Sequence, residues 1–355
     1  MSDRLDEYRR KRDAARTPEP VPRGAPRPTP QNRFVIQQHH ARSLHWDVRL
    51  ERDGVLVSFA VPRGLPRDRA RNHLAKHTED HPLEYLDFAG EIPAGEYGGG
   101  RMTIFDRGTY ETDKWRPDEI GVTFHGTRTS GRYVFFQTGG ADWMVRRMDP
   151  AEPGWDSMPE AVPPMLATAV AGLPRDDAEW GYEMDWAGRR VVAYVSGGRV
   201  RLAAADGVDV TSWYPEIRGL GPALAPTEAV LDGEIVVLAG PRPAPELLAR
   251  RRAPKDAAAA RRAAERTPVH FLAYDLVWLE GRSTVGLVPY AERRDLLEGL
   301  GVRGDNWQTP PYFPGGGAYA LDAAREQGLP GVVAKRLDSP YLPGRRSPLW
   351  RKIAG

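Results

Sequence analysis

Cysteine is absent from this chain of 355 residues, which excludes disulfide bonds, thiol catalysis and thiolate-bound zinc. Long apolar runs are absent as well: no stretch of about 18 apolar residues occurs, so no membrane-spanning helix is expected. The first residues, MSDRLDEYRRKRD, are too charged to be a secretory signal. We therefore expect a cytoplasmic protein without membrane partners, in which any metal ion is bound by histidine, aspartate or glutamate.

A large excess of charge of one sign is also missing. The chain has 50 Lys and Arg against 48 Asp and Glu, a formal net charge of +2, so any affinity for nucleic acid has to come from local clusters of basic residues. Hydrophobic residues make up 41% and charged residues 28%, a balance typical of globular proteins. The length predicts two domains of roughly 150 residues each.

Composition divides the chain into four parts. Residues 1–30 begin with a charged, helical segment over 5–16 and continue into a proline-rich stretch, which predicts an extended arm that does not pack. Residues 31–150 contain short alternating segments separated by Gly, Pro and Asp, which predict a mainly-β barrel or sandwich. Residues 151–163 are predicted to be a linker. Strands and helices alternate over 164–355, which predicts an α/β or α+β domain.

Six of the eight histidines are crowded into a short part of the chain: His39, His40, His45, His73, His77 and His81. The segment LHWDVRL, residues 44–50, is the most informative, because the twofold period of a strand places His45, Asp47 and Arg49 on one face. The apolar residues of the segment then lie on the other face. Imidazole and carboxylate groups suit a divalent cation, and either His39 or His40 would supply a third ligand.

The charged neighbours of this cluster indicate phosphate chemistry. Two neutral imidazoles and one carboxylate leave a bound divalent cation with residual positive charge, which suits a phosphate oxygen or lowers the pKa of bound water. Arg49 offers a planar fork that matches a phosphate group. His81 is a candidate phosphate or proton donor, with Glu79 and Tyr85 as supporting groups. The pattern therefore favours phosphoester hydrolysis.

Other interpretations of these motifs stay open. An HxD pair on a strand is often only a hydrogen-bonded structural pair, and two histidines with one carboxylate also suit a non-haem iron oxygenase. The nearby arginine and the crowding of histidines favour phosphoester chemistry over both. The segment EIPAGEYGGG lacks the Lys-Ser or Lys-Thr of a Walker loop, so it predicts a tight turn between strands.

A family resemblance rests on three segments: RFVIQQHHARSLHWDVRLERDGVLVSFAVPRG, HTEDHPLEYLDFAGEIPAGEYGGGRMTIFDRGTYE and GRYVFFQTGGADWMVRRMD. Together they resemble the 3′-phosphoesterase domain of bacterial DNA ligase D, an end-joining repair enzyme, over roughly residues 8–149. The resemblance implies a manganese-dependent enzyme on a small β-barrel that removes a 3′-terminal ribonucleotide and the 3′-phosphate left behind.

Site residues are carried over from this resemblance by motif. The implied metal ligands are His39, His45 and Asp47, and the implied phosphate contacts are Arg49 and His81. The positions that the family uses for substrate or for support of the site are Arg12, Asp13, Glu19, Glu79 and Tyr85, and the match also covers Lys11 of the arm. Arg63 stands where the family usually has lysine, and we expect it to keep the substrate contact because the charge is retained.

The second half resembles the adenylation domain of ATP-dependent DNA ligases over roughly 164–355, through LDGEIVVL, FLAYDLVWLEGR and GVVAKRLDSPYLPGRRSPLWRKI. This resemblance implies a nucleotidyltransferase-like α/β fold, in which a lysine in E-x-K-W-D-G-x-R attacks ATP to give lysyl-AMP. Here the segment is EMDWAGRR, with Asp185 at the nucleophile and Ala187 at the acidic position. The further departures from the family pattern are Ala204, Pro330 and Ala354, and the charged residues that remain are Glu234, Lys335 and Lys352.

We therefore expect a degenerate, catalytically inactive ligase-like domain. A carboxylate cannot form the phosphoramidate, and its charge repels the α-phosphate, so ATP is not expected as a cofactor. Because the chain stops at Gly355, the OB-fold domain that follows in the family is expected to be missing. A basic cluster, usually a solvated helix face, offers phosphate contacts at Arg250, Arg251, Arg252, Arg261 and Arg262.

The expected function is a DNA-repair 3′-phosphoesterase that uses Mn²⁺ or another divalent cation and associates with the nucleoid. The expected partners are DNA or RNA/DNA 3′ ends and a Ku-like protein or a separate ligase or polymerase. Two rival functions stay open. One is an ATP-dependent ligase that uses another lysine, which a covalent AMP adduct would reveal. The other is a non-catalytic scaffold that binds DNA ends and has no need of a metal.

Overall fold

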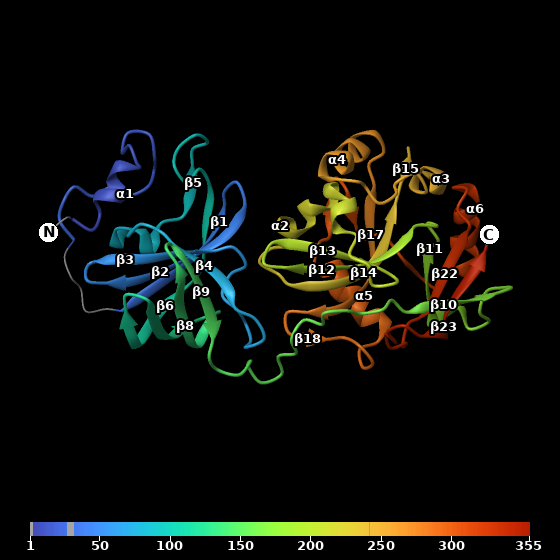
Figure 1. Ribbon diagram of the computed structural model, residues 1–355. Coiled ribbons are helices and arrows are strands. Elements are labelled where there is room, and N and C mark those ends of the chain that lie inside the picture. The colour runs from blue at the N-terminus through green and yellow to red at the C-terminus, as the bar shows by residue number, and fades with distance from the viewer. Residues whose placement is uncertain (1–2, 27–31, 241) are drawn as a thin grey trace. The chain divides into compact units, whose positions relative to one another are not determined.

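The computed structural model describes residues 3–26, 32–240 and 242–355, and it divides the chain into two compact units, Met1–Pro153 and Gly154–Gly355 (Figure 1). The predicted multidomain fold is confirmed, and the boundary lies inside the predicted linker. Part of that linker packs, however, because the apolar side chains of Trp155, Met158 and Val162 join a hydrophobic cluster of the second unit. Within the described residues, no helix has the length and apolar character needed to cross a membrane.

The first unit is an antiparallel β-barrel. Its sheet has the strand order β1-β2-β3-β4-β9-β8-β7-β6-β5, and an additional β1–β6 pairing closes it. The strands are β1 (Arg33–His40), β2 (Leu44–Arg52), β3 (Val55–Val61), β4 (His73–His77), β5 (Gly90–Ile92), β6 (Gly100–Arg116), β7 (Glu119–Gly126), β8 (Ser130–Gly139) and β9 (Asp142–Arg147). Of the predicted alternatives, the structure therefore has the barrel rather than the sandwich.

Strand β2 has the predicted alternation. Trp46, Val48 and Leu50 are buried on one face, as expected for the apolar row. The polar row is buried too, since Asp47 and Arg49 are only 5% and 2% exposed. Burial of both faces means that another part of the chain covers the polar row.

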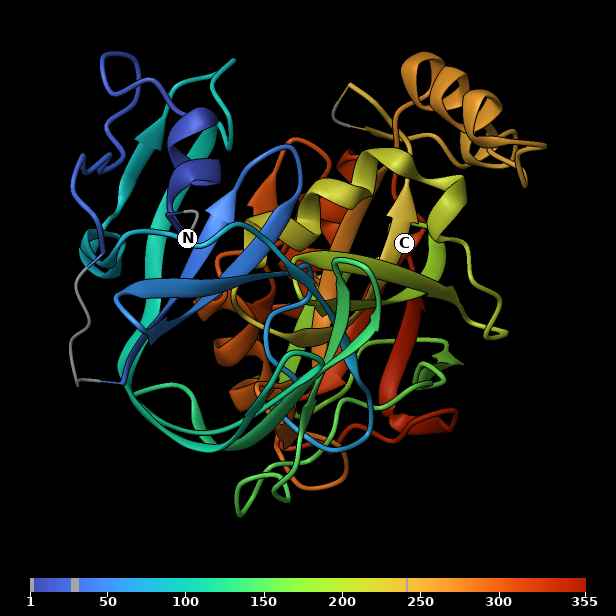
Figure 2. The ribbon, with the colours of Figure 1, turned by 60° about the vertical axis from the view of Figure 1, so that its left-hand side comes forward.

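That cover includes the N-terminal arm, which corrects the expectation that the arm does not pack. The helix α1 is short, Asp6–Arg10, and Leu5 and Tyr8 are buried in a cluster with Val35 of β1 and Tyr85. Figure 2 shows α1 lying beside the strands of the first unit. Proline disfavours regular helix and strand, but it does not prevent an extended chain from docking when its apolar and charged side chains find partners. The predicted arm residues 1–2 and 27–30 lie outside the described residues.

The second unit contains two larger sheets and a two-stranded one. The five-stranded sheet has the order β10-β23-β22-β11-β21, and the seven-stranded sheet has the order β13-β12-β14-β17-β20-β19, with β18 on β17. The strands of these two sheets are β10 (Leu166–Val170), β11 (Trp180–Met184), β12 (Arg189–Ser196), β13 (Arg199–Ala204), β14 (Ala229–Val236), β17 (His270–Leu279), β18 (Arg282–Ser283), β19 (Arg303–Gly304), β20 (Trp307–Gln308), β21 (Phe313–Pro314), β22 (Gly331–Arg336) and β23 (Arg346–Ala354). Strands β15 (Leu238–Ala239) and β16 (Arg242–Pro243) form a separate pair.

The helices of this unit are α2 (Leu220–Leu224), α3 (Pro245–Leu248), α4 (Ala257–Arg266), α5 (Tyr290–Gly299) and α6 (Gly317–Glu326). Helices α2, α5 and α6 contact the two larger sheets, as expected for an α/β unit, whereas α4 contacts the 3-10 helices Thr211–Trp213 and Pro215–Gly219. Helix α4 lies in the Ala- and Arg-rich segment for which the sequence predicts an exposed helix. Arg251 is one residue of the predicted basic cluster that is not exposed. It is buried, and its guanidinium lies 2.7 Å from the carboxylate of Glu216. Arg251 therefore stabilises the fold and is not part of an exposed phosphate-binding face.

Candidate functional site

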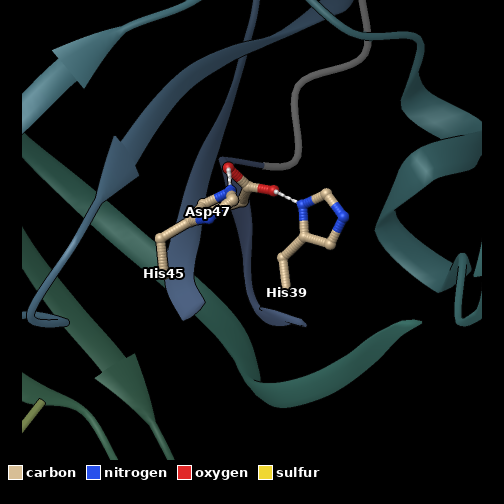
Figure 3. A group of neighbouring side chains, drawn as sticks. All are labelled: His39, His45 and Asp47. Atoms are coloured by element: carbon tan, nitrogen blue, oxygen red, sulfur yellow. Dashed lines mark ion pairs between the residues drawn. The ribbon is translucent and has the colours of Figure 1, made fainter. Parts of the chain in front are cut away.

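Three candidate metal ligands meet on neighbouring strands of the barrel. His39 of β1 lies directly across from His45 of β2 in the strand register, and their ring centroids are 4.7 Å apart. The carboxylate of Asp47 lies between the two rings, with Oδ2 3.5 Å from Nδ1 of His39 and Oδ1 3.6 Å from Nε2 of His45 (Figure 3). One ligand atom from each residue lies within 4.8 Å of the others. The structure therefore brings His39 to this group; His40 instead contacts Gln38.

The outer nitrogens of the two imidazoles are held by backbone carbonyls. Nε2 of His39 lies 2.9 Å from the carbonyl oxygen of Gly98, and Nδ1 of His45 lies 3.0 Å from that of Ser43. When these nitrogens donate their protons, the lone pairs of the other two nitrogens face Asp47. Metal-bound histidines usually make such a second contact, which fixes the tautomer and the ring orientation. The donor set therefore fits a divalent cation.

The loop that supplies Gly98 is the glycine-rich segment between β5 and β6. The sequence predicts only a tight turn there, and the turn is confirmed by a positive φ of 76° at Gly98. Its support of His39 was not predicted. The group that contacts His39 is the backbone carbonyl of Gly98, 59 residues away in the sequence. Because every residue has a backbone carbonyl, the amino-acid sequence does not indicate which one makes this contact.

Asp47 is buried but remains an anion. Burial by itself raises the pKa of this carboxyl group, but the positive charge of Arg49 and the hydrogen bond with His39 outweigh it and hold the pKa of Asp47 well below its usual range. Nη2 of Arg49 donates to Asp47 Oδ2 at 3.0 Å. A permanently charged oxygen ligand beside two imidazoles strengthens the case for a cation site.

The fork of Arg49 is fixed by neighbours that the sequence analysis missed. Its Nε donates to Oε1 of Gln37 at 2.7 Å, and its Nη1 donates to the hydroxyl of Ser58 at 3.0 Å. The guanidinium also lies over the ring of Tyr85, 4.7 Å from its centroid. The sequence did indicate a special role for Gln37, because Gln37 is a polar residue at the end of the apolar run FVI. In the structure it lies across from Asp47 in the register of β1 and β2.

His81 enters the same pocket as a neutral imidazole. Burial, followed by the charges of Arg49 and Arg12, holds the pKa of His81 well below its ordinary value. Its Nδ1 lies 2.8 Å from the carbonyl oxygen of Glu79, and its Nε2 lies 3.3 Å from Nη2 of Arg12, which can donate to it. The positive charge of the pocket therefore comes from the arginines and not from His81.

The N-terminal arm forms one wall of this pocket. Arg12 pairs with Glu19 at 2.7 Å and with Glu79 at 3.0 Å, and all three side chains are almost completely buried. The hydroxyl of Tyr85 donates to Oε1 of Glu19 at 2.5 Å. Lys11 adds a second contact to Glu79, at 3.1 Å. Arg12 and Lys11 hold the pKa of Glu79 below its usual range although burial opposes this.

These groups enclose a cavity of about 210 Å³. Its lining contains most of the residues carried over by motif: Arg12, Glu19, His39, His45, Asp47, Arg49, Glu79, His81 and Tyr85. Thr78 and Tyr97 also line it and were not predicted. The predicted substrate residues Asp13 and Arg63 are exposed and do not line the cavity; the Asp13 carboxylate accepts a hydrogen bond from the backbone of Ala15.

The ligase-like site of the second unit is centred on Asp185, which directly follows β11. Its Oδ2 lies 2.7 Å from Nζ of Lys352 on β23, and its backbone N–H donates to the carbonyl of Gly331. Ala187 has a positive φ of 52°, an uncommon conformation for a residue with a side chain. The position predicted for a lysine nucleophile thus carries a carboxylate in an ion pair.

The remaining charged residues of this site are engaged with the protein. Glu234 accepts a hydrogen bond from the backbone of Gly188 at 3.1 Å, and burial raises the pKa of Glu234. Lys335 is 1% exposed and lies 2.8 Å from Glu183 and 3.9 Å from Asp275. The ring of Trp350 covers its ammonium group at 4.2 Å. Lys335 is thus neutralised within the fold.

Comparisons with known proteins agree with this division. A family model described as the DNA ligase D 3′-phosphoesterase domain matches residues 37–137, and a model of the ATP-dependent DNA ligase domain matches residues 164–354. The multifunctional non-homologous end joining protein LigD of Mycolicibacterium smegmatis is 44% identical over 99% of this chain and 46% of its own length. The protein with the same name in Pseudomonas aeruginosa is 32% identical, over 98% of this chain and 47% of its own length.

A solved structure of mycobacterial DNA ligase D complexed with ATP and MES is 39% identical, covers 54% of this chain and 60% of that chain, and has a TM-score of 0.46. The chain spans about half the length of the curated relatives it matches.

Proposed function

Because the chain belongs to the ATP-dependent DNA ligases and carries a DNA ligase D 3′-phosphoesterase domain ahead of its ligase domain, we propose that the first unit is a metal-dependent phosphoesterase. Its proposed substrates are DNA ends that carry a 3′-phosphate or a 3′-terminal ribonucleotide. The observation that carries the proposal is the convergence of His39, His45 and Asp47 beside the buried guanidinium of Arg49.

The candidate metal ligands and the charged residues around them have distinct roles in this proposal. His39, His45 and Asp47 would hold Mn²⁺ or another divalent cation, which when bound polarises a phosphate oxygen and lowers the pKa of a water molecule. Arg49 binds the remaining phosphate oxygens with a guanidinium already oriented by its neighbours, so little entropy is lost on binding. Glu79, Glu19 and Tyr85 position Arg12 at the wall of the same cavity.

The role of His81 follows from its neutral state. A neutral imidazole does not neutralise an anion, so we assign the charge compensation of the phosphate to Arg12 and Arg49. Nε2 of His81 accepts a hydrogen bond from Arg12 and can instead accept one from a hydroxyl group bound in the cavity. This assignment refines the expectation that His81 is a phosphate contact or a proton donor.

The test of the proposed activity is hydrolysis of a primer-template with a 3′-phosphate in the presence of Mn²⁺. We expect the phosphate to be released and His45→Ala to abolish the release. His125→Ala is the matched control, because His125 lies on β7 and pairs with Glu111 at the exposed surface. Intact substrate after incubation with the wild-type protein, or full activity of His45→Ala, would overturn the proposal.

For the second unit we propose that it does not transfer adenylate. The support is Asp185 at the nucleophile position, with its carboxylate paired to Lys352, and the enclosure of Lys335 among acidic and aromatic side chains. ATP is accordingly not proposed as a cofactor. A covalent AMP adduct on the protein would overturn this and support a ligase that uses another lysine. An apoprotein with no affinity for Mn²⁺ would instead support a scaffold that only binds DNA ends.

We place this activity in non-homologous end joining, the process named for the relatives. The proposed partners are DNA or RNA/DNA 3′ ends, with a Ku-like protein or a separate ligase or polymerase acting on the same break. The proposed location is the nucleoid within the cytoplasm, since that is where broken chromosomal DNA lies in a bacterium. Co-purification of the protein with cross-linked chromosomal DNA, lost after nuclease treatment, tests this location.

A further inference from the structure

Tyr97 lies at the edge of the cavity, and its role is not accounted for by the proposed reaction. It is one of two tyrosines that line the cavity. Tyr85 is 1% exposed and engaged with Glu19, whereas Tyr97 is 48% exposed. The other tyrosines of the first unit are at most 2% exposed, so a half-exposed ring beside a pocket for charged groups indicates a contact surface.

The loop that carries Tyr97 is tied to the metal-ligand group and to the arm. The carbonyl of the next residue, Gly98, lies 2.9 Å from Nε2 of His39. The preceding residue, Glu96, lies 2.6 Å from Arg16 of the arm. The contact between Gly98 and His39 therefore fixes the backbone directly after Tyr97. The ion pair between Glu96 and Arg16 fixes the residue directly before it.

Cationic groups of the arm lie over the ring of Tyr97. Nζ of Lys11 is 4.8 Å from the ring centroid and 3.3 Å from the hydroxyl, and the guanidinium of Arg12 is 5.3 Å from the centroid. Both cations also pair with Glu79 inside the cavity. An aromatic ring with adjoining positive charge is the combination with which proteins bind single nucleic-acid strands without regard to sequence.

The position of the ring matches the shape of a 3′-phosphate end. The phosphate belongs at His39 and Asp47, which are both 5% exposed, so the sugar and base attached to it extend from the buried end of the cavity toward solvent. Tyr97 is the half-exposed tyrosine among the described residues that line the cavity. Its ring is thus the surface that the terminal nucleoside meets.

We propose that Tyr97 is a stacking platform for the base of the terminal nucleotide, and that Lys11 supports it. The inference rests on the proposed 3′-phosphoesterase function and names the part of the substrate that this function leaves unassigned. Stacking accepts any base, because every base has an aromatic face, and this suits an enzyme that processes breaks of arbitrary sequence. Tyr97 is a binding residue in this proposal, since it does not contact the reacting phosphate.

The test compares the binding of two primer-templates that both end in a 3′-phosphate. One has a normal terminal nucleotide and the other has an abasic terminal residue, so that they differ in the base alone. Dissociation constants are measured by fluorescence anisotropy without added metal, so that nothing is hydrolysed. We expect the wild-type protein to prefer the normal end by about 5- to 150-fold, the range of base-aromatic stacking.

Two variants and one control complete the test. Tyr97→Ala should remove the preference, whereas Tyr97→Phe should keep it, because phenylalanine retains the ring and loses the hydroxyl contact to Lys11. Tyr319→Ala is the control: Tyr319 is 84% exposed on α6 of the second unit and should not affect binding. Unchanged melting temperatures would exclude unfolding as the cause of a loss.

The outcomes separate this inference from the proposed function. A wild-type protein without preference for the normal end, or a Tyr97→Ala variant that keeps the preference, overturns the role of Tyr97. The base would then occupy the adjoining open hollow of about 730 Å³, which is lined in part by Arg42 and Glu91. A preference that depends on Tyr97 in a protein that releases no phosphate would overturn the hydrolytic function and leave the stacking site standing.

Discussion

Asp185 and Lys352 form an ion pair in the second unit, with Oδ2 and Nζ 2.7 Å apart. Asp185 is 4% exposed, whereas about half of the Lys352 side chain is accessible. The amine nearest to the expected nucleophile position is therefore directed at a carboxylate and not at a phosphate group. The carboxylate of Asp185 is thus the charged group that Lys352 contacts at this site.

The first prediction concerns this pair. We expect no covalent AMP on the wild-type protein after incubation with ATP and Mg²⁺, as measured by the intact mass of the denatured protein. Asp185→Asn should not form the adduct either, since removing the charge of the partner does not move the amine of Lys352 to the family position. An adduct that maps to Lys352 and disappears in Lys352→Arg would contradict the prediction.

The second prediction concerns the metal ligands. Asp47→Asn keeps the size of the side chain but removes the single negative charge of the group formed with His39 and His45. We expect its affinity for Mn²⁺ to fall by at least about 10-fold, the lower end of what changes around metal ligands usually cost. Isothermal titration calorimetry measures this, with Asp87→Asn as the control, because Asp87 is exposed and pairs with Arg107 at the surface. Equal affinities of the wild-type protein and Asp47→Asn would remove Asp47 from the site.

The third prediction concerns the docking of the arm. Glu19→Gln removes one charge of a buried pair and leaves Arg12 to interact with Glu79 alone. Breaking a buried pair costs about 3–5 kcal/mol when the remaining charge stays buried, which is an upper limit here because the arm can undock into water. We expect faster trypsin cleavage after Arg12 and Arg16, together with loss of phosphatase activity.

The control for this experiment is Glu7→Gln on the same arm. Glu7 is exposed and pairs with Lys11 at 2.8 Å across one turn of chain, so its removal should cost little. Cleavage of Glu19→Gln at the wild-type rate would show that the Arg12–Glu19 pair does not hold the arm on the barrel.

The fourth prediction concerns pH. Burial lowers the pKa of His73, His77 and His81 from the ordinary value of 6.5. As the pH falls through 6.5, the unfolded chain takes up protons at these residues while the folded barrel does not. Protonation thus stabilises the unfolded state. The contribution of these neutral histidines to the free energy of unfolding is fully present above pH 6.5 and is lost as the pH falls below it. We expect the melting temperature of the first unit to fall by about 5 °C between pH 7.5 and 5.5.

Two variants outside the cavity test this assignment. His73→Asn and His77→Gln remove two of the four histidines of this unit whose pKa is lowered by burial, the fourth being His40, so the double variant should show a flatter dependence on pH. The charged groups that influence them are Arg63, Asp68 and Arg71 for His73, and Arg4, Glu7 and Asp80 for His77. A slope identical to that of the wild-type protein would assign the pH dependence to other groups.

Local periodicity made part of the candidate site predictable. The twofold period of a strand is a property of the backbone, so HWDVR was enough to place His45, Asp47 and Arg49 on one face of β2, and the structure confirms that placement. The strand pattern left the choice between His39 and His40 open, because it depends on the register of β1 against β2, and only the family resemblance implied His39. A shift of that register by one residue would have exchanged the two side chains.

Contacts distant in sequence account for what the sequence analysis missed. The arm was expected not to pack because its proline content disfavours regular structure, yet Arg12 and Glu19 meet partners more than 60 residues away. The contribution of Gly98 is a backbone carbonyl, which residue identity does not reveal. The exposure of Tyr97 beside the cavity likewise depends on how the loop before β6 is held.

The sequence by itself determined which chemical groups are present: no thiols, a row of imidazole, carboxylate and guanidinium on one strand face, and a carboxylate where the ligase family has its lysine. These follow from residue identity and from the local geometry of a strand. Only the tertiary structure decided which nitrogen of each histidine faces Asp47, that His81 is buried and neutral, and that Lys352 pairs with Asp185. Ligand geometry and charge state depend on neighbours from distant parts of the chain and on exclusion of water, and neither is encoded in a short segment.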